Sequence, residues 1–172
     1  MNNVDSTPEN QLPVPSDPLM RFLQEIGRVK DDQRLLLLVS HSVLELLTNG
    51  LIELKCKNAK RIASDSRGFP HAARLLILNE IGVISDLQLK AYDSFRKLRN
   101  RAAHEPLFVI KAADLAAFSE RFRDPASFYL LCTALVGGLW NDHVVDLASR
   151  FLPSMADAVA AELAAANEPL SQ

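Results

Sequence analysis

Apolar residues in this chain recur every three or four positions, and no segment of useful length alternates between apolar and polar residues. Only Leu107 to Ile110 is a strand candidate, and it is too short to build a sheet. A period of about 3.6 residues indicates a helix and a period of two indicates a strand, so the sequence predicts an all-α helical bundle. The clearest apolar face is formed by Leu36, Val39, Val43, Leu47, Leu51 and Leu54.

Capping and helix-breaking residues divide the chain into about six to seven helices. Asp17 followed by Pro18 is typical of a helix start, and Gly82 is typical of a helix end. Pro106 ends the helix before it, because the residue preceding a proline disfavours helical geometry. We expect helices over 18–29, 32–57, 70–81, 86–105, 111–122, 126–150 and 153–166, with Asp31 or Asp32 capping the second, Ser85 or Asp86 opening the fourth, and a basic connector over 58–69.

The chain has 172 residues, which suits a single domain, and we place that domain at residues 18–166. Residues 1–17 are polar and contain several prolines, so we expect a flexible N-terminal arm there. Residues 167–172 form the expected C-terminal tail.

Neither membrane insertion nor a disulfide framework is indicated by the sequence. No secretory signal is visible at the N-terminus. The longest uncharged apolar run, residues 126–140, is shorter than the roughly 20 residues of a membrane span. Cys56 and Cys132 lack a partner motif. These features predict a cytoplasmic protein with buried free thiols and no membrane partner.

Basic residues are concentrated in one part of a chain whose net charge is only −2. Residues 55–101 hold eleven lysines and arginines against four aspartates and glutamates, so this segment carries +7. A segregated basic segment attracts polyanions even when the whole molecule is slightly acidic, although charge runs are also typical of a solvated face. The candidate nucleic-acid-binding residues are Lys60, Arg61, Arg96, Lys97 and Arg101.

Arg99, Asn100 and His104 form an Arg-Asn-x3-His motif at the end of a predicted helix. Histidine acts as a general acid or base near neutral pH, and arginine binds phosphate and stabilises the charge that accumulates during phosphoryl transfer. On an unbroken helix, Arg99 and His104 lie about 140° apart. The two side chains meet within one chain only if the backbone leaves regular helix geometry near Ala103, which Pro106 favours.

The motif and its surroundings resemble the HEPN superfamily, the nucleotide-binding domains of higher eukaryotes and prokaryotes. The resemblance covers residues 33–106 and is most specific over residues 98–104 and at the Gly82-Val83-Ile84 turn. Similar domains are α-helical, and many are metal-independent endoribonucleases of toxin–antitoxin and defence systems. The resemblance implies RNA and an antitoxin or regulatory protein as partners, and a homodimer in which two motifs face one another. It implies catalytic roles for Arg99, Asn100 and His104.

A second interpretation comes from the bacterial mannitol-operon-repressor-like branch of that superfamily, which the chain also resembles. The branch is named for gene regulation, and no helix-turn-helix or other DNA-reading element is visible here. The chain is then a non-catalytic transcriptional regulator that acts through protein partners. In that case His104 caps the last carbonyls of its helix, and Arg99 forms a surface ion pair.

Four other polar residues are site candidates. His41 and Glu45 lie one turn apart, a spacing that allows them to pair or to approach the cleft, and an exposed stripe is the favoured interpretation. His71 and His143 have no metal-ligand spacing to another donor. We therefore expect neither a metal nor another cofactor.

The apolar stretch over residues 126–150 is suited to a helix–helix interface. It is our candidate contributor to a homodimer, with Phe128, Tyr129 and Trp140 as core or interface aromatics. The Gly137-Gly138 pair within it predicts either a close approach between helices or a kink, since glycine is unfavourable inside a helix.

Overall fold

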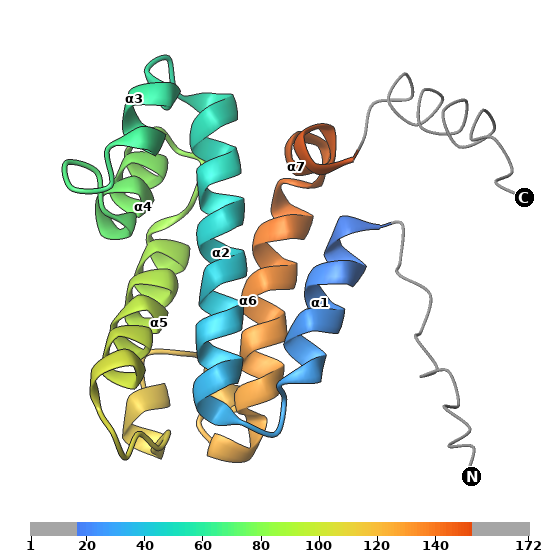
Figure 1. Cartoon of the computed structure of the whole chain (residues 1–172), viewed down its shortest axis with the longest axis vertical. Helices are drawn as coiled ribbons and strands as arrows, with labels where there is room; N and C mark the ends of the chain where they lie inside the picture. The colour runs from blue at the N-terminus through green and yellow to red at the C-terminus, as the bar shows by residue number, and fades with distance from the viewer. Residues whose placement is uncertain (1–16, 153–172) are drawn as a thin grey trace, which may run out of the picture.

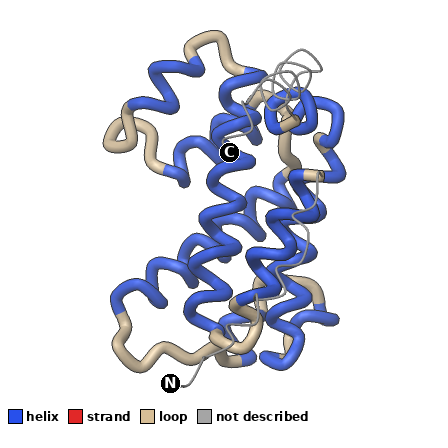
Figure 2. Tube along the Cα trace, turned by 45° about the vertical axis from the view of Figure 1, so that its right-hand side comes forward, coloured by secondary structure: helices blue, strands red, loops and turns tan. Residues whose placement is uncertain are grey.

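Helices account for all the regular structure in residues 17–152, the part of the chain that this computed structural model describes (Figures 1 and 2). No strand occurs within these residues, so the predicted all-α bundle is confirmed. The α-helices are α1 (Pro18–Arg28), α2 (Gln33–Lys55), α3 (Ala59–Ser64), α4 (His71–Glu80), α5 (Asp86–His104), α6 (Phe128–Asp142) and α7 (Val144–Phe151), and the 3-10 helices are η1 (Ala112–Leu115), η2 (Glu120–Phe122) and η3 (Pro125–Ser127).

Helix α2 runs through the middle of the bundle. Figure 1 shows it in cyan, with α4 and α5 on one side and α6 and α1 on the other, and it contacts each of these helices. Its side chains Leu37, Leu47, Leu51 and Ile52 are fully buried. It is also the one described helix long and apolar enough to cross a membrane, but 61% of its most apolar window is buried inside the bundle. Its apolar character is therefore explained by packing on both sides.

Three of the predicted helix starts, at Asp17, Asp32 and Ser85, are confirmed by side-chain caps. Asp17 accepts a hydrogen bond from the Leu19 amide at 2.8 Å, and Asp32 accepts from two amides of the first turn of α2. Ser85 opens α5 with a reciprocal capping box. Gly82 ends the α4 region with a φ of +72°, a left-handed conformation that favours glycine.

Three predicted boundaries are wrong, because tertiary contacts override the local pattern. The basic connector over 58–69 contains α3, which buries Ile62. The predicted helix over 111–122 is replaced by η1 and η2 with a turn between them. The predicted helix over 126–150 breaks at His143, whose φ of −129° is not helical. The predicted N-terminal arm, the helix over 153–166 and the tail lie outside the described residues.

Within residues 17–152, no other helix lies close to the two glycines of α6. A Cβ added at Gly137 or at Gly138 would meet nothing within 4 Å in this part of the chain. Helix α6 also continues unbroken past both of them to Asp142. Of the three aromatics assigned to the core or an interface, Phe128 and Trp140 are buried, whereas Tyr129 is exposed.

The two thiols are both unpaired, and they should react at very different rates. Cys132 is fully buried in α6, and burial raises the pKa of its thiol to about 12, whereas Cys56 is only half-buried. Since the thiolate is the reactive form, a disulfide reagent at pH 8 should modify Cys56 in the folded protein and Cys132 only after unfolding. Mass spectrometry of the time course tests this expectation, and equal rates at both positions in the folded protein would contradict it.

Candidate functional site

The Arg-Asn-x3-His motif lies on the last turns of α5, which is a regular α-helix as far as His104. The amide of Glu105 still donates to the carbonyl of Arg101, so the backbone does not leave helix geometry near Ala103. Arg99 and His104 of one chain could meet only if the helix were broken near Ala103, and it is not broken there. Arg99 and His104 lie about 140° apart around the helix axis.

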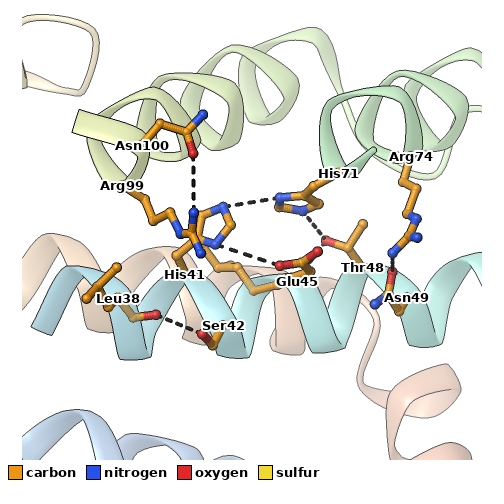
Figure 3. A network of polar contacts seen from close by, with 11 residues as sticks. Leu38, His41, Ser42, Glu45, Thr48, Asn49, His71, Arg74, Arg99 and Asn100 are labelled. Atoms are coloured by element: carbon orange, nitrogen blue, oxygen red, sulfur yellow. Dashed lines mark hydrogen bonds and ion pairs between the residues drawn. The ribbon is translucent and has the colours of Figure 1, made fainter. Parts of the chain in front are cut away.

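The two sides of α5 place the motif residues in different surroundings. Asn100 and His104 are exposed, and their four-residue spacing puts them on one face. Within residues 17–152, the His104 side chain makes no hydrogen bond or ion pair. Arg99 is half-buried and extends toward α2, where Figure 3 shows its guanidinium beside His41. Arg99 also donates to the Asn100 side-chain oxygen at 3.5 Å.

Most of the predicted nucleic-acid-binding residues are held in ion pairs within the chain. Arg96 and Lys97 both bind the Asp93 carboxylate, at 2.7 and 2.8 Å. Arg101 bridges Glu105 and Asp114. Lys60 and Arg61 are exposed on α3 and form no ion pair among the described residues. Much of the positive charge of α5 is therefore neutralised by acidic side chains. Among the described residues, the positive charges of Lys60 and Arg61 on α3 are not neutralised in this way.

Next to Arg99, two histidines meet between α2 and α4. We define the buried histidine cluster as His41, Glu45 and Thr48 of α2 together with His71, the first residue of α4 (Figure 3). His41 is 4% exposed and His71 is 8% exposed. His41 Nε2 lies 3.2 Å from His71 Nδ1, and the other His71 nitrogen lies 3.4 Å from the Thr48 hydroxyl oxygen. His41 Nδ1 lies 4.0 Å from a carboxylate oxygen of Glu45.

The Thr48 hydroxyl determines how His71 is oriented. Its hydrogen is donated to the carbonyl of Leu44 at 2.7 Å, so its oxygen is free to accept. His71 Nε2 therefore carries a hydrogen and donates it to Thr48. In the neutral ring, His71 Nδ1 then has a free lone pair, and this lone pair faces His41.

Burial keeps both histidines uncharged. Burial lowers the pKa of His41 to about 4, and the positive charges of Arg99 and then Arg96 add to the effect. Burial likewise lowers the pKa of His71 to about 3; His41, Arg74 and Arg96 add to this effect, and Asp93 opposes it. At neutral pH the cluster thus offers unprotonated imidazole nitrogens beside the half-exposed carboxylate of Glu45.

The predicted exposed stripe at His41 and Glu45 is wrong for His41. The sequence interpretation gave α2 one buried face, whereas the bundle covers it on two sides, and the second buried face contains these polar residues. A signal was present, because positions 41, 45 and 48 follow the same spacing as the apolar positions. His71 had no such signal, since it reaches the cluster from another helix.

A buried arginine fixes α4 against α2 and α3 near the cluster. Arg74 is 4% exposed and donates to the Asn49 side-chain oxygen at 2.7 Å and to the Ala63 carbonyl at 3.3 Å. Replacing Asn49 with alanine leaves one charged nitrogen without its partner. We expect Asn49→Ala to lower the free energy of unfolding by about 2–3 kcal/mol.

Urea denaturation at pH 7 measures the effect of Asn49→Ala. The exposed Asn100→Ala variant is the matched control and should change stability by less than about 0.5 kcal/mol. An equally small change for Asn49→Ala would show that the Arg74–Asn49 contact is not required.

Comparisons with protein-family models, with curated proteins and with solved structures find no match to this chain. The structure itself defines the chain as an all-α bundle with two notable features. One is the exposed Asn100–His104 face on α5, and the other is the buried histidine cluster between α2 and α4, next to Arg99.

Proposed function

We propose that this chain is a cytoplasmic, HEPN-like RNA-binding protein that cleaves RNA without a metal, at a site shared by two copies. The observation that carries the proposal is the exposed face of Asn100 and His104, next to an arginine that α5 directs elsewhere. A histidine whose side chain has no partner within residues 17–152 is available to a substrate. The motif's resemblance to the HEPN superfamily supports the assignment of RNA as that substrate.

The chemistry assigned to the motif is a transesterification. His104 takes the proton of the ribose 2′-hydroxyl or supplies a proton to the leaving oxygen. The 2′-oxygen attacks phosphorus and the P–O5′ bond breaks, which leaves a 2′,3′-cyclic phosphate and a 5′-hydroxyl. Arg99 stabilises the charge on the phosphate during this step, and we assign Asn100 the role of donating a hydrogen bond to the same phosphate.

A second copy is needed because of the geometry of α5. Two side chains about 140° apart on one regular helix do not converge on one phosphate, so we assign Arg99 and His104 of each site to different copies. Leu107 and Val109 lie directly after α5 and are 94% and 57% exposed. Leu130, near the start of α6 at the same end of the bundle (Figure 1), is 54% exposed. Such exposed apolar side chains suit a dimer contact beside His104.

The basic side chains support RNA binding in two ways. Lys60 and Arg61 are exposed and free to contact phosphates. The pairs that Arg96 and Lys97 make with Asp93 are partly exposed, and exposed ion pairs contribute no more than about 1 kcal/mol. A polyanion therefore competes with Asp93 at low cost.

Mixing two inactive variants tests the shared site. Arg99→Ala and His104→Ala copies with different tags are co-expressed, and the heterodimer is purified through both tags. A two-fold dimer has two equivalent sites, of which the heterodimer keeps one complete, so we expect about half of the wild-type cleavage rate. A heterodimer as inactive as its parents would place Arg99 and His104 of one site on the same copy, contrary to this proposal.

One observation favours the second candidate function, a non-catalytic regulator acting through a protein partner. Arg96, Lys97 and Arg101 each form an ion pair with an acidic side chain of their own chain. Such pairing is typical of a helix whose role is structural rather than RNA binding. The two functions differ in what wild-type protein does to RNA. A regulator leaves RNA intact, and its exposed Leu107 and Leu130 then contact a regulatory protein partner.

A further inference from the structure

The buried histidine cluster has the donor set and the spacing of a transition-metal site. We infer that His41, His71 and Glu45 bind one divalent transition-metal ion, of the zinc or cobalt type, between α2 and α4. The inference is independent of the proposed RNA cleavage, which needs no metal. It rests on the placement of the ligand atoms, on the groups that orient the rings, and on the charges around the cluster.

The distances fit a single ion. One ligand atom from each of His41, Glu45 and His71 lies within 4.8 Å of the other two. The two facing nitrogens, His41 Nε2 and His71 Nδ1, are 3.2 Å apart. Two nitrogens bound to zinc at about 2.0–2.1 Å in tetrahedral geometry lie roughly 3.3 Å apart. Two histidines and one carboxylate are a ligand set that zinc uses when a fourth position stays open.

The hydrogen bond on the far side of the His71 ring orients its Nδ1 lone pair toward His41. Metal-binding histidines nearly always donate their second N–H to a neighbouring acceptor, and His71 donates its Nε2 hydrogen to Thr48. The ring planes are nearly perpendicular, at 86°, and the 3.2 Å contact between the rings is made by one nitrogen of each. Without an ion, His41 Nε2 donates its hydrogen to His71 Nδ1. Metal binding requires that hydrogen to move to His41 Nδ1, which leaves a lone pair on His41 Nε2 for the ion.

The remaining ligand is free to move into place. Glu45 is one helical turn beyond His41, and its side chain is 40% exposed, so it can change rotamer without disturbing the core. Arg99 and Arg96 add positive charge near His41, which Glu45 partly offsets. An anion, such as a phosphate group, is therefore the ligand that suits the open position of the bound ion.

Cobalt(II) titration of the metal-free protein tests the inference directly. Co²⁺ is added to EDTA-treated, dialysed protein, and visible absorption is followed to find the stoichiometry and the affinity. We expect one ion per chain with the absorption of a low-symmetry nitrogen–oxygen site, and displacement by Zn²⁺. Saturation at one ion per chain would support the site, and no absorption change at millimolar Co²⁺ would overturn it.

Variants then assign the ligands. Glu45→Gln keeps the size and partial exposure of the side chain, so it should fold normally and weaken Co²⁺ binding by roughly tenfold or more. Thr48→Val, which removes the acceptor for His71, should also weaken binding, and His71→Ala should abolish it. His104→Ala removes a histidine outside the cluster and should bind Co²⁺ as the wild type does.

Thermal unfolding distinguishes a variant that has lost a metal ligand from a variant that has failed to fold. Zn²⁺ should raise the Tm of wild-type protein and of His104→Ala, but should raise that of Glu45→Gln much less. Equal shifts in all three proteins would place the ion elsewhere and overturn the inference. Cleavage measured in EDTA tests the proposed function separately, so either idea can fail without the other.

Discussion

Acidification from pH 7 to pH 4 in EDTA should destabilise this protein by on the order of 5 kcal/mol through His41 and His71 alone. Both rings are buried and uncharged, with their pKa values lowered to about 4 and about 3. In the unfolded chain a histidine has a pKa near 6.5. Between these values the unfolded state binds more protons than the folded state, so stability falls as pH falls.

The steepest part of this loss lies between pH 6.5 and pH 4. Near pH 5.5, unfolding should take up nearly two protons at this pair, and the free energy of unfolding should fall by about 2 kcal/mol per pH unit. Carboxylates add to acid unfolding mainly at lower pH, since their ordinary pKa values are near 4. Urea denaturation at several pH values between 7 and 5 measures the slope.

Two variants separate the pair from the rest of the molecule. The double variant His41→Gln, His71→Gln has no titrating group in the cluster, so it should lose most of the slope. His104→Gln lies outside the cluster and should keep it. If the double variant retained the wild-type slope, the acid sensitivity would have another origin. The claim that His41 and His71 are uncharged in the folded protein would then be wrong.

Replacing His104 with alanine should slow RNA cleavage by about 10²–10⁴-fold, the usual contribution of a general acid or base. The fold should not suffer, because His104 is exposed at the end of α5 and makes no side-chain bond within residues 17–152. Single-turnover cleavage of a labelled oligonucleotide, with protein in excess, measures the rate without a contribution from product release.

Lys90→Ala provides the matched control for His104→Ala. Lys90 is another exposed basic residue of α5, at a distance from the motif, so its loss should leave the rate within a few-fold of wild type. A His104→Ala protein that cleaves at the wild-type rate would show that the histidine has no catalytic role. A large drop in Tm would instead favour the capping role of the regulator interpretation.

Local sequence signals predict the starts of α1, α2 and α5 and the turn at the end of α4, because those features depend on neighbouring residues. Asp17, Asp32 and Ser85 each accept backbone hydrogen bonds from the first turn of their helix, and Gly82 adopts its left-handed conformation. A cap requires only the few residues around it, so no knowledge of the bundle is needed to place it.

Features set by several helices together were not predictable in the same way. The apolar period of α2 indicates one buried face, and the local sequence does not show that α4 and α5 cover a second one. The spacing of positions 41, 45 and 48 is consistent with a second face, but these residues are polar and equally suit an exposed stripe. The burial of His41 depends on that second face, and its partner His71 comes from thirty positions further along the chain. A search for short spacings therefore finds His41 and Glu45 but does not connect them with His71.

The motif itself is an intermediate case. Its residues and its place at the end of a helix were predictable, and Pro106 correctly indicates that α5 stops before it. The bend near Ala103 was expected from that proline, but the helix remains regular to His104 and the chain leaves it only at Glu105. A single copy therefore keeps Arg99 and His104 apart, which is why the proposed site needs two.

The most direct test of the account is cleavage of RNA by purified wild-type protein in EDTA, with chemical analysis of the new ends. The account predicts 2′,3′-cyclic phosphate and 5′-hydroxyl ends, produced by the wild type and lost in both Arg99→Ala and His104→Ala. Intact RNA after incubation with folded wild-type protein would contradict it, and so would cleavage that persists in both variants.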